Sequence, residues 1–463
     1  MLYMNRKTHS VDMTVGSPLK HILRFAIPLI FTGLLQSFYS SADMVVVGRF
    51  AGEDALAAVG STSSAINLII NLFIGMSTAA GVLVARKFGA KNQGGVTKAV
   101  HTAIALSIVG GLVLTVVGFF VAGPLMEIMG APTETFSLSV LYMRIYFAGA
   151  VPMLLYNFGG AILRGIGDTK RPLIYLIISG IINVVLNVIL VAGFNMSVDG
   201  VAIATLISQM VSAVLVLRAL MNTDECYKLI IKKLHIYKAE YLEILRLGIP
   251  AGIQSSVFSF SNLIIQSSIN SVGAIAMAGN AAAASIEGFV YFSMNAFYQA
   301  SVTFTSQNYG AYDFKRIRKG VLRSALSVGV LGAVLGILLA VFAENVVGLF
   351  SEVPEVIRCG AVRVRIICSL YLLVGFMEVA TGAVRGLGLS IRPMIITIVC
   401  LCGGRIAPIL FYGPYKEVDD LMVLYLSYPL SWFITTIANY TLFIVTYKSR
   451  KKKYLLQREE VIA

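Results

Sequence analysis

Four polar residues in the first half of the chain carry oxygen atoms that suit a proton or a hard cation: Asp43, Asn183, Asn187 and Thr205. Each lies within a long apolar run. An aspartate inside hydrocarbon costs about 3 kcal/mol on insertion scales, so Asp43 is a functional candidate. Asn183 and Asn187 are four residues apart, and their amides therefore project from one face of a helix. A carboxylate beside amide and hydroxyl oxygens can take up a proton or bind Na⁺, so we predict a cation-coupling site here.

The expected depths of these residues agree. At about 1.5 Å per residue, Asp43 lies about 35 Å along its helix from Lys20, and Asn187 lies about 24 Å from the cytoplasmic end of another helix. Thr205 lies about 10 Å below the outer end of a third helix. All are then in the outer part of a membrane, where they can converge. The alternatives are a helix-end carboxylate near the outer headgroups for Asp43, and ordinary interhelical hydrogen bonds for the asparagines.

Three further ionisable residues lie in apolar runs of the second half: Glu287, Glu378 and Arg405. Glu287 is expected about 18 Å from the outer end of its helix and Arg405 about 21 Å from the inner end, a shared depth at which they can pair. Glu378 lies two turns before Arg385, near the cytoplasmic side. We take all three residues as candidates for a substrate or proton site. The alternative is that the two carboxylates are neutralised structural partners of Arg405 or Arg144.

The elements that must position these residues are transmembrane helices. Of the 463 residues, 57% are hydrophobic and 13% are charged, against roughly a quarter charged in soluble domains. A helix crosses the hydrocarbon core with about 20 apolar residues. The apolar runs predict twelve spans, and therefore an all-α polytopic membrane protein. The predicted spans are 19–48, 54–84, 97–123, 134–162, 171–195, 198–221, 241–270, 275–304, 318–343, 356–383, 391–413 and 420–447.

Charge alternates between successive connections. Lys and Arg gather at 20–24, 86–98, 164–171, 228–238, 315–319, 385–392 and 448–453. Asp and Glu gather at 53–54, 127–134, 199, 344–355 and 417–420. By the positive-inside rule the first set is cytoplasmic, and both termini are inside. The net charge of +14 then reflects topology, and no nucleic-acid partner is expected.

The two halves of the chain resemble each other. RGIGDTKRPLI at Arg164–Ile174 recurs 221 residues later as RGLGLSIRPMI at Arg385–Ile395, and KFGAKN at Lys87–Asn92 recurs as NYGAYD at Asn308–Asp313. We expect two six-helix lobes, 1–221 and 241–447, with a cytoplasmic linker at 222–240 and a basic cytoplasmic tail at 448–463. An even number of spans in each copy makes them parallel repeats, a construction suited to alternating access.

Other function classes lack the residues that they need. The five cysteines show no spacing typical of a metal site or a disulfide framework, and the four histidines are scattered. No set of nucleophile and base stands out, so we do not expect an enzyme. A channel would need rings of polar residues, and the sequence has no such pattern. We expect no cofactor and no metal.

Together the motifs resemble the multidrug and toxic compound extrusion (MATE) family, most closely its DinF-type branch. The resemblance covers nearly the whole chain. It rests on the two RGxG loops and on IPLIFTGLLQSFYSSADMVVVGRFAGEDALAAVG at Ile27–Gly60, NVVLNVILV followed by GVAIATLISQ, and QNYGA at Gln307–Ala311. It implies a twelve-helix, two-lobe antiporter of the cell membrane that exports organic cations, drugs or other amphiphilic compounds in exchange for protons or Na⁺.

The expected partners are small organic molecules and the lipid bilayer, and we expect a monomer. The alternative function is a flippase or exporter of a lipid-linked or other non-cationic metabolite. A membrane-embedded enzyme has less support.

The resemblance also bears on individual residues. In that branch the positions matching Asp43, Asn183 and Thr205 carry the same residue types, whereas the position matching Asn187 is often an aspartate. With one carboxylate fewer, protonation of Asp43 is the simpler coupling step, and a Na⁺ site has less support.

Two prolines occupy equivalent places in spans one and seven. Pro28 and Pro250 are 222 residues apart, and each removes a helical hydrogen bond. We predict that the helices bend there. The alternative is that proline is simply frequent in membrane helices.

Overall fold

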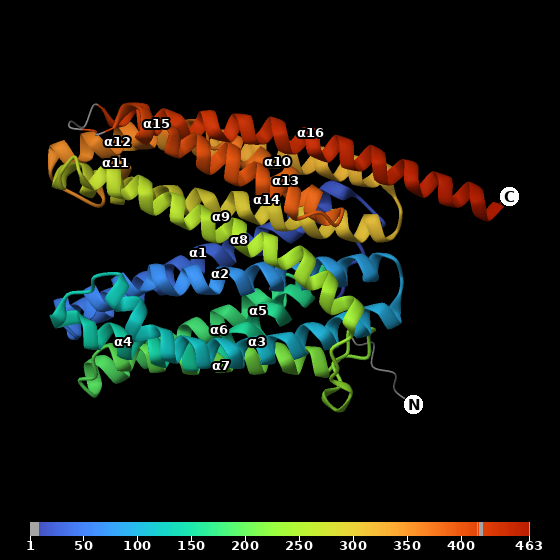
Figure 1. The fold of residues 1–463 in the computed structure, drawn as a ribbon, viewed down its shortest axis with the longest axis horizontal. Coiled ribbons are helices and arrows are strands. Elements are labelled where there is room, and N and C mark those ends of the chain that lie inside the picture. Colours follow the sequence, from blue (N-terminus) through green and yellow to red (C-terminus); the bar gives the residue numbers. More distant parts are fainter. Residues whose placement is uncertain (1–8, 414, 416–419, 463) are drawn as a thin grey trace. The chain divides into compact units, whose positions relative to one another are not determined.

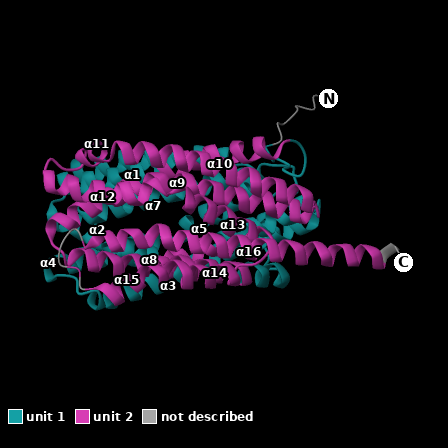
Figure 2. Ribbon diagram, turned by 90° about the horizontal axis from the view of Figure 1, so that it is seen from above, with its two compact units in different colours: residues 1–16, 35–67, 77–245 teal, residues 17–34, 68–76, 246–463 magenta. Residues whose placement is uncertain are grey.

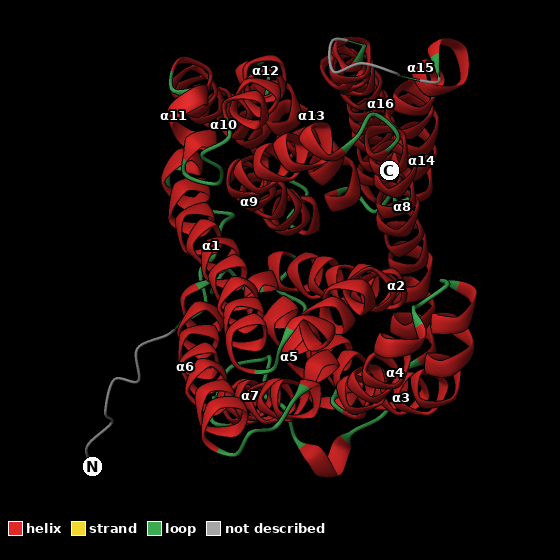
Figure 3. Ribbon diagram, turned by 90° about the vertical axis from the view of Figure 1, so that its left-hand side faces the viewer, coloured by secondary structure: helices red, strands yellow, loops and turns green. Residues whose placement is uncertain are grey.

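The computed structural model describes residues 9–413, 415 and 420–462. In this part of the chain all regular structure is helical, with no strand (Figure 3). The acidic connection expected at 417–420 lies, apart from Asp420, outside the described residues.

Seven α-helices and one π-helix form the first half of the chain. They are α1 (Pro18–Phe50), α2 (Glu53–Gly89), α3 (Gln93–Ile128), α4 (Thr133–Ala148), α5 (Ala150–Gly165), α6 (Lys170–Asn187), the π-helix η1 (Val188–Gly193) and α7 (Val198–Met221).

The described part of the second half begins with a short 3₁₀ turn in the linker and continues with helices to near the end of the chain. These elements are η2 (Ile231–Lys233), α8 (Lys238–Asn270), α9 (Ala274–Gly310), α10 (Phe314–Val341), α11 (Ala343–Gly348), α12 (Pro354–Ser369), α13 (Leu372–Gly386), α14 (Ile391–Ile396), the π-helix η3 (Thr397–Gly403), α15 (Gly404–Tyr412) and α16 (Leu421–Ile462).

By length and apolar composition, the described helices account for eleven of the twelve predicted spans. Among the described residues, nine helical segments are long and apolar enough to cross a membrane, and two bent pairs, α4 with α5 and α12 with α13, pass the same test together. The predicted span 241–270 corresponds to α8, whose 33 residues are long enough to cross a membrane. It contains the serine-rich stretch SSVFSFSN and is not among the eleven.

The predicted spans 134–162 and 356–383 each correspond to a pair of helices joined at a bend, and the sequence analysis did not predict these bends. The first is bent by 50° and the second by 46°. The breaks fall at Gly149 and at Leu370, residues at which the helical backbone conformation is lost.

The chain forms two compact units. Unit 1 comprises residues up to 16, 35–67 and 77–245, and unit 2 comprises 17–34, 68–76 and 246–463 (Figure 2). The beginning of α1 and a short stretch of α2 therefore pack with unit 2, although the sequence repeat assigns them to the first half.

Equivalent turns in the two halves have the same backbone conformation. Lys91 and Tyr312, which match in the repeat, both have a φ of 56° in the left-handed region. The residues that follow them, Asn92 and Asp313, cap α3 and α10 by accepting backbone N–H hydrogen bonds at 2.8 and 2.9 Å. Such side chains satisfy an amide that the first turn of a helix leaves free. The repeated sequence thus produces repeated helix starts.

The described residues before α1 are attached to unit 1. The backbone N–H of Val11 donates to the carbonyl of Ile166 at 2.8 Å. Asp12 accepts a hydrogen bond from Lys91 and one from the backbone N–H of Thr14. Met13 is buried. This N-terminal segment, residues 9–16, therefore has a defined place against the loops of unit 1.

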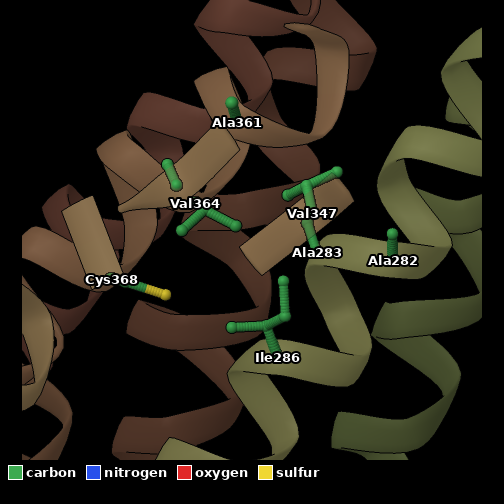
Figure 4. Packing of buried hydrophobic residues seen from close by; sticks show 8 residues of the cluster. Ala282, Ala283, Ile286, Val347, Ala361, Val364 and Cys368 are labelled. Carbon is green, nitrogen blue, oxygen red and sulfur yellow. The ribbon is translucent and has the colours of Figure 1, made fainter. Parts of the chain in front are cut away.

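Close helix packing in unit 2 brings α9 against α12. A Cβ atom on Gly279 would lie only 2.9 Å from the backbone nitrogen of Gly360, so glycine at both positions lets the two helices approach. Small side chains fill the space beside this crossing (Figure 4). The cluster contains Ala282, Ala283, Ile286, Ala343, Val347, Ala361, Val364 and Cys368.

The last helix is longer than a membrane is thick. α16 has 42 residues, or about 63 Å of helix, against about 30 Å of hydrocarbon. Its end projects past the other helices of unit 2 (Figure 1). Lys451 to Lys453 are exposed in this projecting part, so the predicted basic tail continues α16 as a helix.

Candidate functional site

A chain of hydrogen bonds in unit 1 joins the four residues of the predicted coupling site. The Nδ2 of Asn187 donates to Oδ1 of Asp43 and lies 3.5 Å from Oδ1 of Asn183. The Nδ2 of Asn183 donates in turn to Oγ1 of Thr205 at 3.4 Å. The last two distances are long for hydrogen bonds. The structure thus brings together side chains from α1, α6 and α7.

The packing of the Tyr39 ring against Gly180 brings Asp43 close to α6. Tyr39 lies one helical turn before Asp43 on α1, and Gly180 lies one turn before Asn183 on α6. A Cβ atom on Gly180 would lie 1.9 Å from Cζ of Tyr39, so the ring occupies space that any larger residue would take. The hydroxyl of Tyr39 also donates to the carbonyl of Ile177 at 3.4 Å. Sequence analysis missed Gly180 because a glycine in an apolar run gives no sign of what packs on it.

The site can exist in two hydrogen-bonding states. Asn183 and Asn187 are buried and Asp43 is half-buried. The amide nitrogen of Asn187 faces Asp43, which suits an ionised carboxylate, while the buried Oδ1 of Asn187 has no hydrogen-bond partner. If the amide turned over, its Oδ1 would face a protonated Asp43 and could accept a hydrogen bond from the new O–H group.

A multivalent metal site is a poor fit to these ligands. The described residues contain no group of three or more His, Cys, Asp or Glu side chains that could hold a metal ion. The only carboxylate in the hydrogen-bond chain just described is that of Asp43. The arrangement suits one proton or one monovalent cation.

Glu287 is paired, but its partner is not the predicted one. Its Oε1 and Oε2 accept hydrogen bonds from Nε and Nη2 of Arg363 at 2.6 and 2.9 Å. Arg363 also donates to Asn280. The expected pairing with Arg405 or Arg144 is wrong. Arg363 lies on α12, which packs on α9, whereas α15 with Arg405 packs on α16.

Arg144 lies elsewhere, in unit 1. Its guanidinium stacks on the ring of Phe119 at 4.7 Å. Sequence analysis missed Arg363, although a signal was present, because an arginine well inside predicted span ten is as unusual as the glutamates that were noticed.

Arg405 is held by aromatic rings. Its guanidinium carbon lies 4.3 Å from the ring centre of Tyr428, 5.3 Å from that of Phe258 and 5.7 Å from that of Trp432. The residue is only 3% exposed. Its buried Nε has no hydrogen-bond partner, and the described residues offer Arg405 no ion pair.

Glu378 differs from Glu287 in having no cation bound to it. The structure gives this half-buried carboxylate no hydrogen bond or ion pair among the described residues. Arg385, two turns further along α13, donates instead to the hydroxyl of Tyr298 and to Oε1 of Gln254, the latter at 2.8 Å. Glu378 therefore remains a candidate proton or substrate site.

The two prolines lie inside unbroken helices. α1 continues through Pro28 and α8 continues through Pro250. The hydroxyl of Thr32 donates to the carbonyl of Pro28 at 2.9 Å. Bending at these positions stays a prediction.

Comparison with known proteins decides the family. The MatE family model matches residues 28–189 and 250–408, one stretch in each half. The chain belongs to the MATE family. The matched stretches contain every site residue named above in the sequence analysis except Thr205.

Two relatives match this MATE protein along nearly their whole length. The chain is 28% identical over 441 residues to the probable multidrug resistance protein YoeA of Bacillus subtilis, covering 94% of this chain and 95% of that protein. It is 24% identical over 427 residues to a FAD transporter of Shewanella oneidensis, covering 91% and 93%.

A solved structure shows the same fold. An outward-facing multidrug resistance MATE transporter of the MOP superfamily superposes with a TM-score of 0.89 at 23% identity, covering 97% of this chain and 100% of that one. The family match and the relatives make the protein a multi-pass membrane transporter of the MATE type and not an enzyme, and its fold is that of MATE structures with twelve membrane-spanning helices.

Proposed function

We propose that this MATE protein is a secondary active antiporter that exports small amphiphilic organic compounds and is driven by protonation of Asp43. The observation that supports this most is the contact between Asp43 and the buried amide of Asn187. An ionised carboxylate within a membrane is energetically costly, so its presence there indicates a function. Here it has no cation beside it in the hydrogen-bond chain, and one proton would remove its charge.

The proposed coupling step uses only these side chains. With Asp43 ionised, the Asn187 amide donates to it. A proton arriving from the outer side neutralises Asp43, and the amide then turns to accept from the new O–H group. Because Asn187 also contacts Asn183, which donates to Thr205, the change is transmitted from α1 to α6 and α7.

Coupling to Na⁺ is the second candidate. The buried Oδ1 of Asn187 has no partner, and Oδ1 of Asn183 and the hydroxyl of Thr205 are close to it in the same chain of contacts. With Asp43, these are the oxygen ligands that a hard cation takes. We rank protons first because a single carboxylate gives a weak site for a metal cation.

The substrate is proposed to be amphiphilic, within the wide range that the relatives' names suggest, from multidrug resistance proteins to a FAD transporter. Of the two intramembrane glutamates predicted in the second half, Glu378 is the one available to a cationic compound, because Glu287 is paired with Arg363. We further propose that both termini are cytoplasmic and that the protein works as a monomer.

Uptake of ethidium into inverted vesicles that contain the purified protein tests this function. An inside-acidic pH gradient should drive uptake in the wild-type protein, and Asp43→Asn should abolish it while leaving expression intact. Asp54→Asn, an exposed carboxylate in the first turn of α2, is the matched control and should keep wild-type uptake. Undiminished gradient-driven uptake by Asp43→Asn would overturn the assignment. Uptake driven only by an inside-high Na⁺ gradient would establish the second candidate.

A further inference from the structure

One cluster of unit 2 contains two buried arginines and one buried glutamate. The centre of the Tyr428 ring lies 4.3 Å from the guanidinium carbon of Arg405 and 5.5 Å from that of Arg363. Glu287 is the one carboxylate that forms an ion pair with either arginine among the described residues, and it pairs with Arg363. The cluster therefore carries one positive charge in excess, within helices that cross the membrane.

The glutamate is fully used by Arg363. Both of its oxygens bond that guanidinium, and Asn280 takes a third N–H group of Arg363. Arg363 is thus satisfied on several sides. Arg405 makes no hydrogen bond or ion pair to any residue that the structure describes, and its Nε is buried without a partner. The excess charge therefore belongs to Arg405.

The rings around Arg405 hold it in place without neutralising it. Tyr428 and Trp432 meet edge to face with centroids 6.0 Å apart, and Trp432 meets Tyr371 in the same way at 5.3 Å. Aromatic faces attract a guanidinium, but they accept none of its five N–H donors in the plane where an oxyanion would bind. The buried guanidinium of Arg405 is therefore suited to a ligand that carries a negative charge.

The position of Arg405 within the repeat places it deep in the protein. A shift of 221 residues relates the two RGxG loops, and it makes Arg405 the counterpart of Val184, next to Asn183. Span eleven thus has its arginine at the level where span five has the amides of the coupling site. An arginine at this depth does not have the location of a topology anchor at the cytoplasmic end.

We propose that Arg405 binds the anionic group of an amphiphilic substrate. This group is a carboxylate, a sulfonate or a phosphate, and the apolar part of the substrate packs against Phe258, Tyr428 and Trp432. The planar guanidinium pairs such oxyanions through two parallel N–H bonds. This inference rests on the proposed export function and makes it more specific, because the exported compounds then include organic anions.

The test compares two probes in inverted vesicles under an inside-acidic pH gradient: tritiated taurocholate, an amphiphilic sulfonate, and the cation ethidium. The wild-type protein should accumulate taurocholate. Arg405→Gln should lower the ratio of taurocholate to ethidium uptake at least tenfold, and Arg405→Lys, which keeps the charge but not the planar fork, should lower it less. Arg365→Gln is the matched control, an exposed arginine of α12 paired with Glu344, and should match the wild type.

A binding measurement separates the failure of this inference from that of the export function. Taurocholate should raise the melting temperature of the purified wild-type protein and should not raise that of Arg405→Gln. Ethidium uptake without taurocholate uptake or thermal stabilisation would overturn the inference and leave the export function standing. If neither probe is transported, the export function fails, and Arg405-dependent stabilisation by taurocholate then decides the inference alone.

A purely structural role for Arg405 predicts a different result. If the guanidinium served to hold α15 on α16, Arg405→Gln without ligand would melt at a lower temperature than the wild type. If it is a binding group, removing an unneutralised buried charge should leave the melting temperature unchanged or raise it. A lower melting temperature together with an unchanged ratio of the two uptakes would contradict the proposal.

Discussion

Glu287 and Arg363 form a two-bond ion pair in unit 2, with oxygen-to-nitrogen distances of 2.6 and 2.9 Å. The relationship links two residues 76 positions apart and depends on the glycine crossing of α9 and α12. It also removes Glu287 from the groups that could attract a cationic substrate. The pair has a structural role, so its loss should lower the stability of the protein more than it changes transport.

Removing one partner of this pair should be strongly destabilising. Glu287→Gln leaves the buried guanidinium of Arg363 without a carboxylate, and breaking a buried pair in this way costs about 3–5 kcal/mol. We expect a clear fall in the melting temperature in detergent. The double variant Glu287→Leu with Arg363→Met should lose much less than the sum of the single variants. Glu344→Gln, in the exposed pair with Arg365, should change stability by about 1 kcal/mol or less.

Gly180→Ala should disturb the coupling site through Tyr39. The new methyl group would occupy the place of the Tyr39 ring, and overpacking of this kind costs about 1–3 kcal/mol. We expect a lower melting temperature and weaker proton-driven ethidium uptake. Gly193→Ala, on the same span but with nothing within 4 Å of the added atom, is the control. If adding Tyr39→Ala did not restore stability to Gly180→Ala, the explanation by this contact would be wrong.

Asn187→Asp should change the ion that the site accepts. A second carboxylate beside Asp43 doubles the negative charge available to a cation, and ligand charge is what raises affinity for hard cations. We expect ethidium uptake by this variant to become dependent on an inside-high Na⁺ gradient. Asn187→Ala removes the amide without adding charge and should lose uptake under either gradient. If Asn187→Asp still showed proton-driven uptake that did not depend on Na⁺, a cation-binding site at this position would be contradicted.

The attachment of the N-terminal segment should depend on pH only under strongly acidic conditions. Burial raises the pKa of Asp12, but hydrogen bonds from Lys91 and Thr14 outweigh it and hold the pKa below its ordinary value of 3.8. Because the pKa is lower in the folded protein, the ionised carboxylate stabilises the docked segment above the unfolded pKa, and this is lost as the pH falls through the folded pKa.

Hydrogen exchange of residues 9–16, corrected for intrinsic rates, measures this attachment. Asp12→Asn should exchange about two- to fivefold faster at neutral pH, in line with about 0.5–1 kcal/mol for a partly exposed pair. Wild-type protection should be constant from about pH 8 to 5, well above the pKa of a carboxyl group. A loss of protection already between about pH 7 and 6 would contradict the role given to Asp12.

Much of the fold follows from the sequence because hydropathy and repeat motifs report local physics. Apolar runs predicted the twelve spans, and the KFGAKN and NYGAYD motifs mark turns that share a backbone conformation. The bends at Gly149 and Leu370 were missed, since a helix that is broken within an apolar run keeps its hydropathy.

The expected depth of residues in the membrane predicted one cluster correctly and the partner of Glu287 wrongly. Asp43 and Asn187 were placed together by depth alone, and the structure joins them. Depth also suggested that Glu287 and Arg405 meet, yet Glu287 bonds Arg363. Depth fixes only the height of a residue in the membrane. The choice of neighbour is made by which helices touch, and that depends on glycines such as Gly279 and on aromatic rings from distant spans.

A π-helix adjoins a site residue in each half. Asn187 immediately precedes η1, and Arg405 follows η3 by two residues. A π turn holds one residue more than an α turn, and passing that extra residue along the helix turns each side chain it passes by about 100° about the helix axis. The span stays helical while this happens, and the carbonyls near the moving turn exchange i→i+5 hydrogen bonds for i→i+4 ones. Asn187 and Arg405 therefore stand where a side chain can change the direction in which it points without its helix leaving the membrane.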